Sequence, residues 1–109
     1  MADSGKGYRS GLEIVRDVLL VAEEAGDSGS KKTHIMYGAN LSYKLLTRYL
    51  EEVLNAGLVC EGGSCYVITD KGREFLRAYH DYENRREEIN DRISRLNSGK
   101  ENLEKMLEH

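Results

Sequence analysis

The chain of 109 residues is long enough for one domain with its own hydrophobic core and too short for two. Hydrophobic residues make up 39% of it and charged residues 32%, a composition that excludes an intrinsically disordered chain. The formal net charge of −3 excludes the strongly basic character of proteins that coat nucleic acid indiscriminately, and the absence of proline favours helices.

The sequence indicates neither a membrane segment nor a metal site. Its longest aliphatic run, residues 18–22, is too short to span a bilayer, and the polar N-terminus lacks the apolar region of a signal peptide. Two cysteines and histidines at no finger-like spacing do not make a zinc site. We therefore expect a cytoplasmic protein without metal or cofactor, and we interpret residues 107–109 as the remnant of a tag.

Apolar residues at helical spacing predict a first helix over residues 11–25. Ser10 stands where a side chain caps the free N–H groups of a helix, and Gly26 stands where a left-handed residue ends one. We expect residues 1–9 to be flexible and residues 27–30 to form a short loop.

Two further helices are predicted on either side of a glycine-containing turn. The first covers residues 32–38, and Ser42 caps a second that runs to about Ala56 and is closed by Gly57. Residues 38–40 supply the glycine and asparagine that a tight turn needs. This is a helix-turn-helix pattern, although periodicity alone does not distinguish it from any tight helical hairpin.

A short β-hairpin follows the helix-turn-helix. Residues 58–60 and 65–68 are β-prone runs joined by a segment that contains Gly62 and Gly63, which accommodate the positive φ angles of a tight turn. A helix-turn-helix with an adjoining hairpin is a winged helix, so the predicted fold is mainly α with a small β-hairpin. We expect the two cysteines to face each other across the hairpin as reduced thiols, with a redox-sensing pair as the alternative.

The last helix carries apolar residues in the alternating three- and four-residue steps of a coiled coil. We call these positions the seam: they are Phe75, Tyr79, Tyr82, Arg86, Ile89, Ile93, Leu96, Lys100 and Leu103. A helix over residues 70–97 would be about 42 Å long, and a small winged-helix core cannot cover it. We therefore assign residues 10–78 to the winged helix-turn-helix and residues 70–106 to a dimerisation helix and tail. The expected dimer contacts are Tyr82, Arg86, Ile89, Ile93 and Leu96.

The sequence leaves three features of this helix open. The far half of the seam needs either a second chain or a fold-back of the tail, because the small core cannot cover it. Ser98 and Gly99 are expected to end the helix and to leave Lys100 onward as a short extra turn. Arg86 either pairs with an acidic residue of a partner or packs its alkyl stem and leaves its charge in water, and we expect the latter for Lys100. The pattern does not choose between a parallel and an antiparallel pair.

Charge is distributed unevenly along the chain. Residues 28–50 contain no Asp or Glu, and this acid-free window coincides with the predicted helix-turn-helix. Lys31, Lys32 and Thr33 open its first helix, where backbone N–H groups and the helix dipole favour a phosphate. The alternative is that these lysines are simply exposed to solvent.

The second helix of this window has a polar face that begins at Ser42. Tyr43, Lys44, Thr47 and Arg48 fall within an arc of roughly 140° on a helical wheel, opposite the leucines. Such side chains contact phosphates and base edges in the major groove of DNA. The alternative is an ordinary solvated helix face.

The hairpin tip, Gly62, Gly63 and Ser64, is placed to lie along a neighbouring groove or backbone, but it carries Glu61 and no cation. We expect it to contribute less than the helix. Motifs of catalysis, such as a glycine-rich phosphate loop or a nucleophile elbow, do not occur. We therefore predict that the protein is not an enzyme.

Two segments carry a resemblance to a known family. The run Ile35-Met36-Tyr37, continued by residues 39–43, resembles the "ten-a" group of archaeal DNA-binding proteins and their transcription-regulator relatives. Residues 68–76 resemble that group's junction between the last strand and the last helix, and the likeness covers roughly residues 11–80. It implies a winged helix-turn-helix, an antiparallel coiled-coil homodimer and binding to double-stranded DNA at the nucleoid.

Together these observations predict a homodimeric winged-helix protein that reads the major groove with the helix beginning at Ser42. The acidic net charge favours a site-selective transcription regulator over an abundant chromatin protein. The alternative is a winged helix that serves protein–protein interaction and assembly and does not bind DNA.

Overall fold

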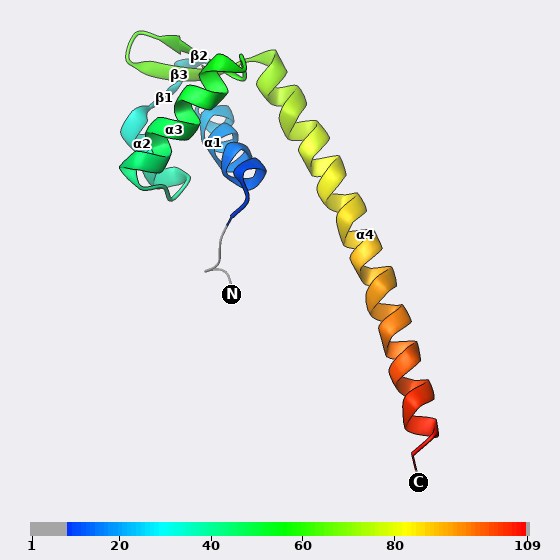
Figure 1. The fold of residues 1–109 in the computed structure, drawn as a ribbon. Helices are drawn as coiled ribbons and strands as arrows, with labels where there is room; N and C mark the ends of the chain where they lie inside the picture. Colours follow the sequence, from blue (N-terminus) through cyan, green and yellow to red (C-terminus); the bar gives the residue numbers. More distant parts are fainter. Residues whose placement is uncertain (1–8, 109) are drawn as a thin grey trace. The chain divides into compact units, whose positions relative to one another are not determined.

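The computed structural model describes residues 9–108 and divides into two units, one ending at Arg77 and the other beginning at Ala78. Figure 1 shows the elements in chain order. They are α1 (Gly11–Ala25), a 3-10 turn η1 (Gly26–Ser28), β1 (Ser30–Lys31), α2 (Lys32–Gly38), α3 (Tyr43–Asn55), β2 (Val59–Gly62), β3 (Cys65–Ile68) and α4 (Asp70–Met106). The predicted fold class, helices with a small hairpin and a long last helix, is confirmed.

Helix α1 has the predicted bounds because both of its ends are encoded locally. The Glu13 N–H donates to Ser10 Oγ at 3.2 Å, and the Ser10 N–H donates to Glu13 Oε1 at 3.0 Å, which completes a capping box. At the other end, Gly26 has a φ of 64° and its N–H donates to the Glu23 carbonyl.

Helices α2 and α3 are joined by a tight turn that ends α2 with a left-handed residue. Asn40 has a φ of 54°, and the N–H groups of Asn40 and Leu41 donate to the carbonyls of Tyr37 and Met36 at 3.2 and 2.9 Å. This is the Schellman pattern of a helix C-terminus. Two residues after Asn40, Ser42 caps α3 by accepting the Leu45 N–H at 3.2 Å, as the sequence predicts.

The sheet has three strands in the order β1-β3-β2, one more than the hairpin predicted from sequence. Ser30 and Lys31 lie in what was expected to be loop and helix start, and they pair with Tyr66 and Cys65 of β3. Two residues are too short for a periodic pattern, so only the tertiary pairing defines this strand.

The expectation that the cysteines face each other is wrong. Cys60 lies opposite Val67, whereas Cys65 lies opposite Gly62, so the two thiols are offset diagonally along the hairpin. Diagonal residues on neighbouring strands have Cα atoms roughly 7–8 Å apart, beyond the usual span of a disulfide. Both cysteines are free thiols.

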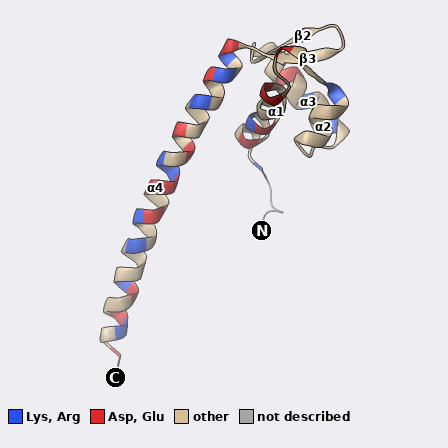
Figure 2. Cartoon of the chain, turned by 180° about the vertical axis from the view of Figure 1, so that it is seen from behind, with Lys and Arg blue, Asp and Glu red and all other residues tan. Residues whose placement is uncertain are grey.

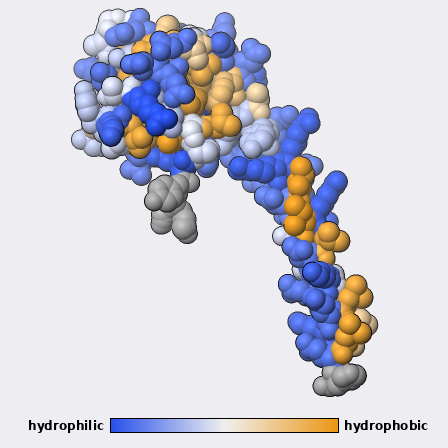
Figure 3. Space-filling view, in the orientation of Figure 1, coloured by the Kyte–Doolittle hydropathy of each residue, from blue (hydrophilic) through white to orange (hydrophobic). Residues whose placement is uncertain are grey.

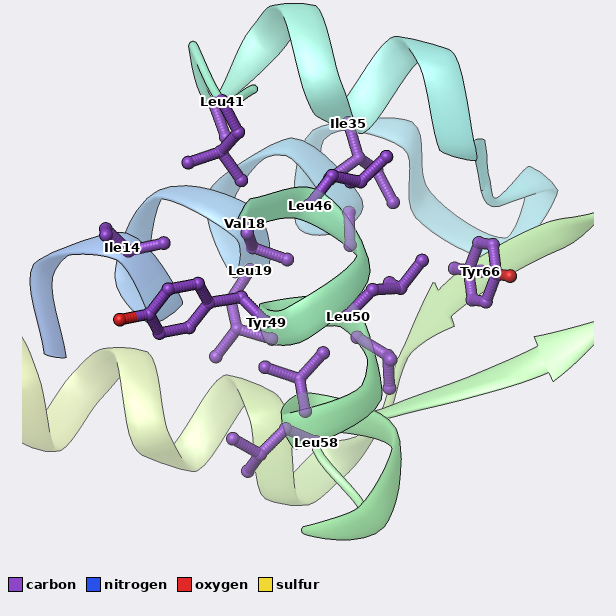
Figure 4. Packing of buried hydrophobic residues seen from close by; sticks show 14 of the residues in the cluster. Ile14, Val18, Leu19, Ile35, Leu41, Leu46, Tyr49, Leu50, Leu58 and Tyr66 are labelled. Carbon is purple, nitrogen blue, oxygen red and sulfur yellow. The ribbon is translucent and has the colours of Figure 1, made fainter. Parts of the chain in front are cut away.

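The core lies among α1, α2, α3 and the sheet (Figure 4). Its largest fully buried side chains are Leu19, Ile35, Leu46, Val18 and Val53. Phe75 and Leu76, in the first turns of α4, pack against this cluster. The beginning of the seam therefore belongs to the winged-helix core, and only its later positions remain for another contact.

Helix α4 is a single helix of 37 residues, about 55 Å long at the usual rise. The expectation that it ends near Ser98 and Gly99 is wrong. One glycine in a helix interior is about 1 kcal/mol less favourable than alanine, which does not break a helix that lacks proline. Within residues 9–108, no helix combines the length and apolar character of a membrane span.

Candidate nucleic-acid interface

The exposed face of α3 consists of the side chains predicted to contact DNA. Tyr43 is 67% exposed, and Lys44, Thr47 and Arg48 are exposed with it. The opposite face, with Leu46, Tyr49, Leu50 and Val53, is buried in the core. Burial of one face fixes the rotation of α3 about its axis and directs the polar face to solvent.

Local contacts restrict several of these polar side chains. The Thr47 hydroxyl donates to the Tyr43 carbonyl at 3.0 Å, and the guanidinium carbon of Arg48 lies 5.2 Å from the centre of the Tyr49 ring. Since Tyr49 is buried, its ring is held in place by the core, and the cation–π contact restricts the position of the Arg48 guanidinium. Arg48 is therefore partly ordered before it meets any ligand.

The cations of the acid-free window have no acidic partner in the part of the chain that the structure describes. Within the described residues 9–108, none of Lys31, Lys32, Lys44 and Arg48 forms a salt bridge. Elsewhere in the same unit, Arg9, Arg16 and Arg73 pair with Asp17 or Asp70. Figure 2 shows how basic and acidic residues are distributed over the chain. The unpaired charge on the helix-turn-helix is available to an anionic partner.

Lys31, Lys32 and Thr33 are all exposed, as a set of phosphate contacts requires. The structure assigns Lys31 to the end of β1 and to the N-cap of α2. It therefore belongs to the sheet as well as to the helix. Lys31, Thr33 and the exposed Tyr37 border an open hollow of about 540 Å³.

The wing is formed by β2, β3 and the turn between them. Gly62, Gly63 and Ser64 are exposed at its tip, and Gly63 has a φ of 64°. Lys31 lies directly opposite Cys65, the first residue after the turn, so β1 places a cation beside the tip end of the wing. The sequence did not show this neighbour because 34 positions separate it from Cys65 along the chain.

Two residues near this surface were missed by the sequence reasoning. Tyr37 is 78% exposed on α2, and only the structure shows this exposure. Arg9 donates hydrogen bonds to the carbonyls of Ala39 and Asn40 in the turn. Nothing in the local pattern around Arg9 indicates a partner so distant in sequence.

From Tyr82 onward, the seam positions of the second unit lie on its surface. Tyr82, Ile89, Ile93 and Leu96 are between 50% and 74% exposed. Figure 3 shows hydrophobic side chains along one side of the long helix. The Arg86 guanidinium carbon lies 5.6 Å from the centre of the Tyr82 ring, so its charge is held against a neighbour in the seam.

Comparison with known proteins identifies the family. The model of the winged helix-turn-helix family matches residues 8–87, most of the chain. The chain belongs to this family. An uncharacterized protein of Methanocaldococcus jannaschii is 23% identical over 73 residues, which are 67% of this chain and 72% of the relative.

A solved structure shares the fold. The crystal structure of Sso10a-2, described as a DNA-binding protein from Sulfolobus solfataricus, matches with a TM-score of 0.60 and 24% identity. The match covers 93% of this chain and 99% of that one. The resemblance to the archaeal ten-a group is thus confirmed at the level of the fold.

Proposed function

We propose that this protein binds double-stranded DNA as a homodimer and inserts α3 into the major groove. The observation that carries the proposal is the exposed face of α3, where Lys44 and Arg48 have no acidic partner among the described residues. A helix of this kind fits the major groove, and cations together with hydroxyl groups contact phosphates and base edges there. The DNA-binding description of Sso10a-2 supports the same assignment.

The other predicted contacts extend this surface. Lys31, Lys32 and Thr33 would bind phosphate beside α3, and Ser42 would do so from the helix start. Gly62, Gly63 and Ser64 would follow the adjacent backbone without a cation of their own. We infer a site-selective regulator because the net charge of −3 disfavours indiscriminate coating of DNA. Such a protein would lie at the nucleoid in the cytoplasm.

Dimerisation is proposed through the exposed part of the seam. An isolated amphipathic helix is marginal in water, and its stability comes mainly from packing of the apolar face. Tyr82, Arg86, Ile89, Ile93 and Leu96 would pack against a second copy, antiparallel as the resemblance implies. Two winged helices on one dimer would then contact two sites on a duplex.

The decisive experiment reverses the charges on α3. The double variant Lys44→Glu, Arg48→Glu should lose nearly all affinity for a random-sequence duplex at low salt and retain the circular dichroism spectrum of the native protein. The milder Lys44→Ala, Arg48→Ala should lower the log–log salt slope by about 3.6, since the dimer loses four phosphate contacts that contribute about 0.9 each.

The matched control is Arg95→Glu, Lys105→Glu, which changes net charge equally at exposed positions of α4 outside the seam. It should bind DNA far more tightly than the α3 variant. Equal loss in both would mean that only net charge matters. A native protein that shifts no duplex at low salt would instead favour the assembly module, which the acidic net charge also suits.

A further inference from the structure

The guanidinium of Arg9 spans from the start of α1 to the turn of the helix-turn-helix. Its Nη1 donates to Asp17 Oδ2 and to the Ala39 carbonyl, both at 2.7 Å, and its Nη2 donates to the Asn40 carbonyl at 2.7 Å. The other oxygen of Asp17, Oδ1, accepts from Arg16 Nε at 2.8 Å. We call this group the turn clasp: Arg9, Asp17 and the carbonyls of Ala39 and Asn40 that accept hydrogen bonds from Arg9.

The turn clasp bonds carbonyls at the end of α2. The Schellman pattern there uses the N–H groups of Asn40 and Leu41, while the carbonyls of Ala39 and Asn40 point toward Arg9. A cation at a helix C-terminus also interacts favourably with the dipole of the helix. Asn40 has a φ of 54°, and among residues 9–108 it is the single residue other than glycine with a positive φ. The clasp therefore holds the most conformationally unusual point of the turn.

We propose that Arg9 and Asp17 are positioning residues that fix the orientation of α3 for DNA binding. Only Leu41 separates Asn40 from Ser42, the N-cap of α3. Movement of the turn would therefore displace Tyr43 and Lys44, which lie in the first turn of the proposed reading helix. This inference rests on the proposed function, because the effect it describes is on DNA affinity.

Arginine is suited to this role in a way that lysine is not. Its planar fork presents several donors in fixed directions, whereas a lysine ammonium is a point charge. Arg9 uses that fork to reach one carboxylate and two carbonyls at once. Arg9→Lys thus keeps the charge that a phosphate would attract and removes the geometry that holds the turn.

Asp17 offers a test in which charge and geometry act in opposite directions. Asp17→Asn removes a negative charge from an acidic protein, which by electrostatics alone should leave DNA binding unchanged or tighten it. If the clasp positions α3, the same substitution should weaken binding. Glu23→Gln on the same helix makes the same charge change at an exposed residue outside the clasp and is the matched control.

The experiment measures the affinity of the native protein and three variants for a labelled random-sequence duplex over a range of salt concentrations. All proteins are held well below their thermal transitions. Arg9→Lys and Asp17→Asn should bind about tenfold more weakly, as expected when a charge-assisted hydrogen bond is lost, with an unchanged salt slope. Glu23→Gln should bind at least as tightly as the native protein. Amide hydrogen exchange at Asn40 and Leu41, whose N–H groups are hydrogen-bonded in the turn, should accelerate in the first two variants alone.

Two results would overturn the proposal. Binding by Asp17→Asn equal to that of Glu23→Gln would show that the clasp does not position α3. Native affinity in Arg9→Lys would show that charge alone suffices at this position, as it would for a direct phosphate contact, and that the fork geometry is not needed. A native protein without DNA affinity would refute the proposed function instead, and unchanged exchange at Asn40 and Leu41 in Asp17→Asn would then refute the clasp separately.

Discussion

Helix α3 and the part of α4 after Arg77 are both amphipathic. They differ in how far the same chain buries their apolar residues. In α3, Leu46 and Val53 are each 1% exposed because the same chain packs against them. In α4, Ile89 and Leu96 are 57% and 74% exposed. The same kind of pattern therefore describes an internal core in one region and a surface available to another chain in the other.

The two regions also differ in how charge is arranged. The polar face of α3 carries Lys44 and Arg48 and contains no acid before Glu51, whereas α4 carries both signs throughout (Figure 2). Mixed charge keeps a long helix hydrated with little net field, and unmixed charge creates a local field that attracts an anion. The net charge of the chain is therefore a poor guide to the field around α3.

The largest effect is expected from breaking the exposed seam. Ile89→Lys, Ile93→Lys should convert a dimer into a monomer, because four isoleucine side chains per dimer would lose about 6 kcal/mol of burial. Light scattering reports the mass, and circular dichroism should show a loss of helix that matches the marginal stability of an unpaired helix. Ser94→Lys, Asn102→Lys adds the same charge away from the seam and should remain dimeric. A native monomer at micromolar concentration would contradict the proposed role of α4.

The next effect concerns the buried face of α3. Leu46→Ala should lower the free energy of unfolding by about 2–5 kcal/mol, the usual result of a cavity in a packed core. Leu12→Ala, at a residue that is 52% exposed, should lower it far less. Chemical denaturation of both variants measures the difference. Similar losses would mean that α3 does not supply the core.

A smaller loss of stability is expected from a substitution at Gly72, near the start of α4. A Cβ at Gly72 would clash with the Leu58 carbonyl oxygen and lie 2.6 Å from Ile68 Cγ1. Gly72→Ala should therefore destabilise the winged helix by about 1–3 kcal/mol, as overpacking does. Thermal and chemical unfolding measure this loss. An unchanged midpoint would show that the junction between β3 and α4 relaxes without strain.

The smallest effect has the opposite sign. A Cβ at Gly99 meets nothing within 4 Å, and the residue lies inside a helix. Gly99→Ala should stabilise α4 by about 0.5–1 kcal/mol, because alanine loses less backbone entropy than glycine on helix formation. Helix content during denaturation measures the gain. A loss of stability here would indicate a close contact at Gly99 in the assembled protein.

Features encoded by neighbouring residues were predictable from the sequence. The bounds of α1 follow from Ser10, Glu13 and Gly26, which cap the helix through contacts within a few positions. The start of α3 follows in the same way from Ser42. Side chains on the polar face of α3 were identified because helical periodicity alone separates them from the buried face.

Features that depend on distant residues were not predictable. Strand β1 exists because Ser30 and Lys31 pair with β3, and the offset of Cys60 from Cys65 follows from the register of the hairpin. The full length of α4 was underestimated because Ser98 and Gly99 were interpreted as a helix end. A glycine inside a helix lowers its stability without ending it, and the sequence pattern does not distinguish the two cases.

The sequence by itself determined the amphipathic helices, their caps, the acid-free window and the seven-residue repeat of the seam, because each is a pattern within one segment. Only the tertiary structure decided which apolar faces are already covered and which charges are already paired. Phe75 packs against the core while Ile89 remains exposed, and Arg9 is paired with Asp17 while Arg48 has no such partner among the described residues. Burial and pairing require residues distant in sequence to meet in space, so no local pattern contains them.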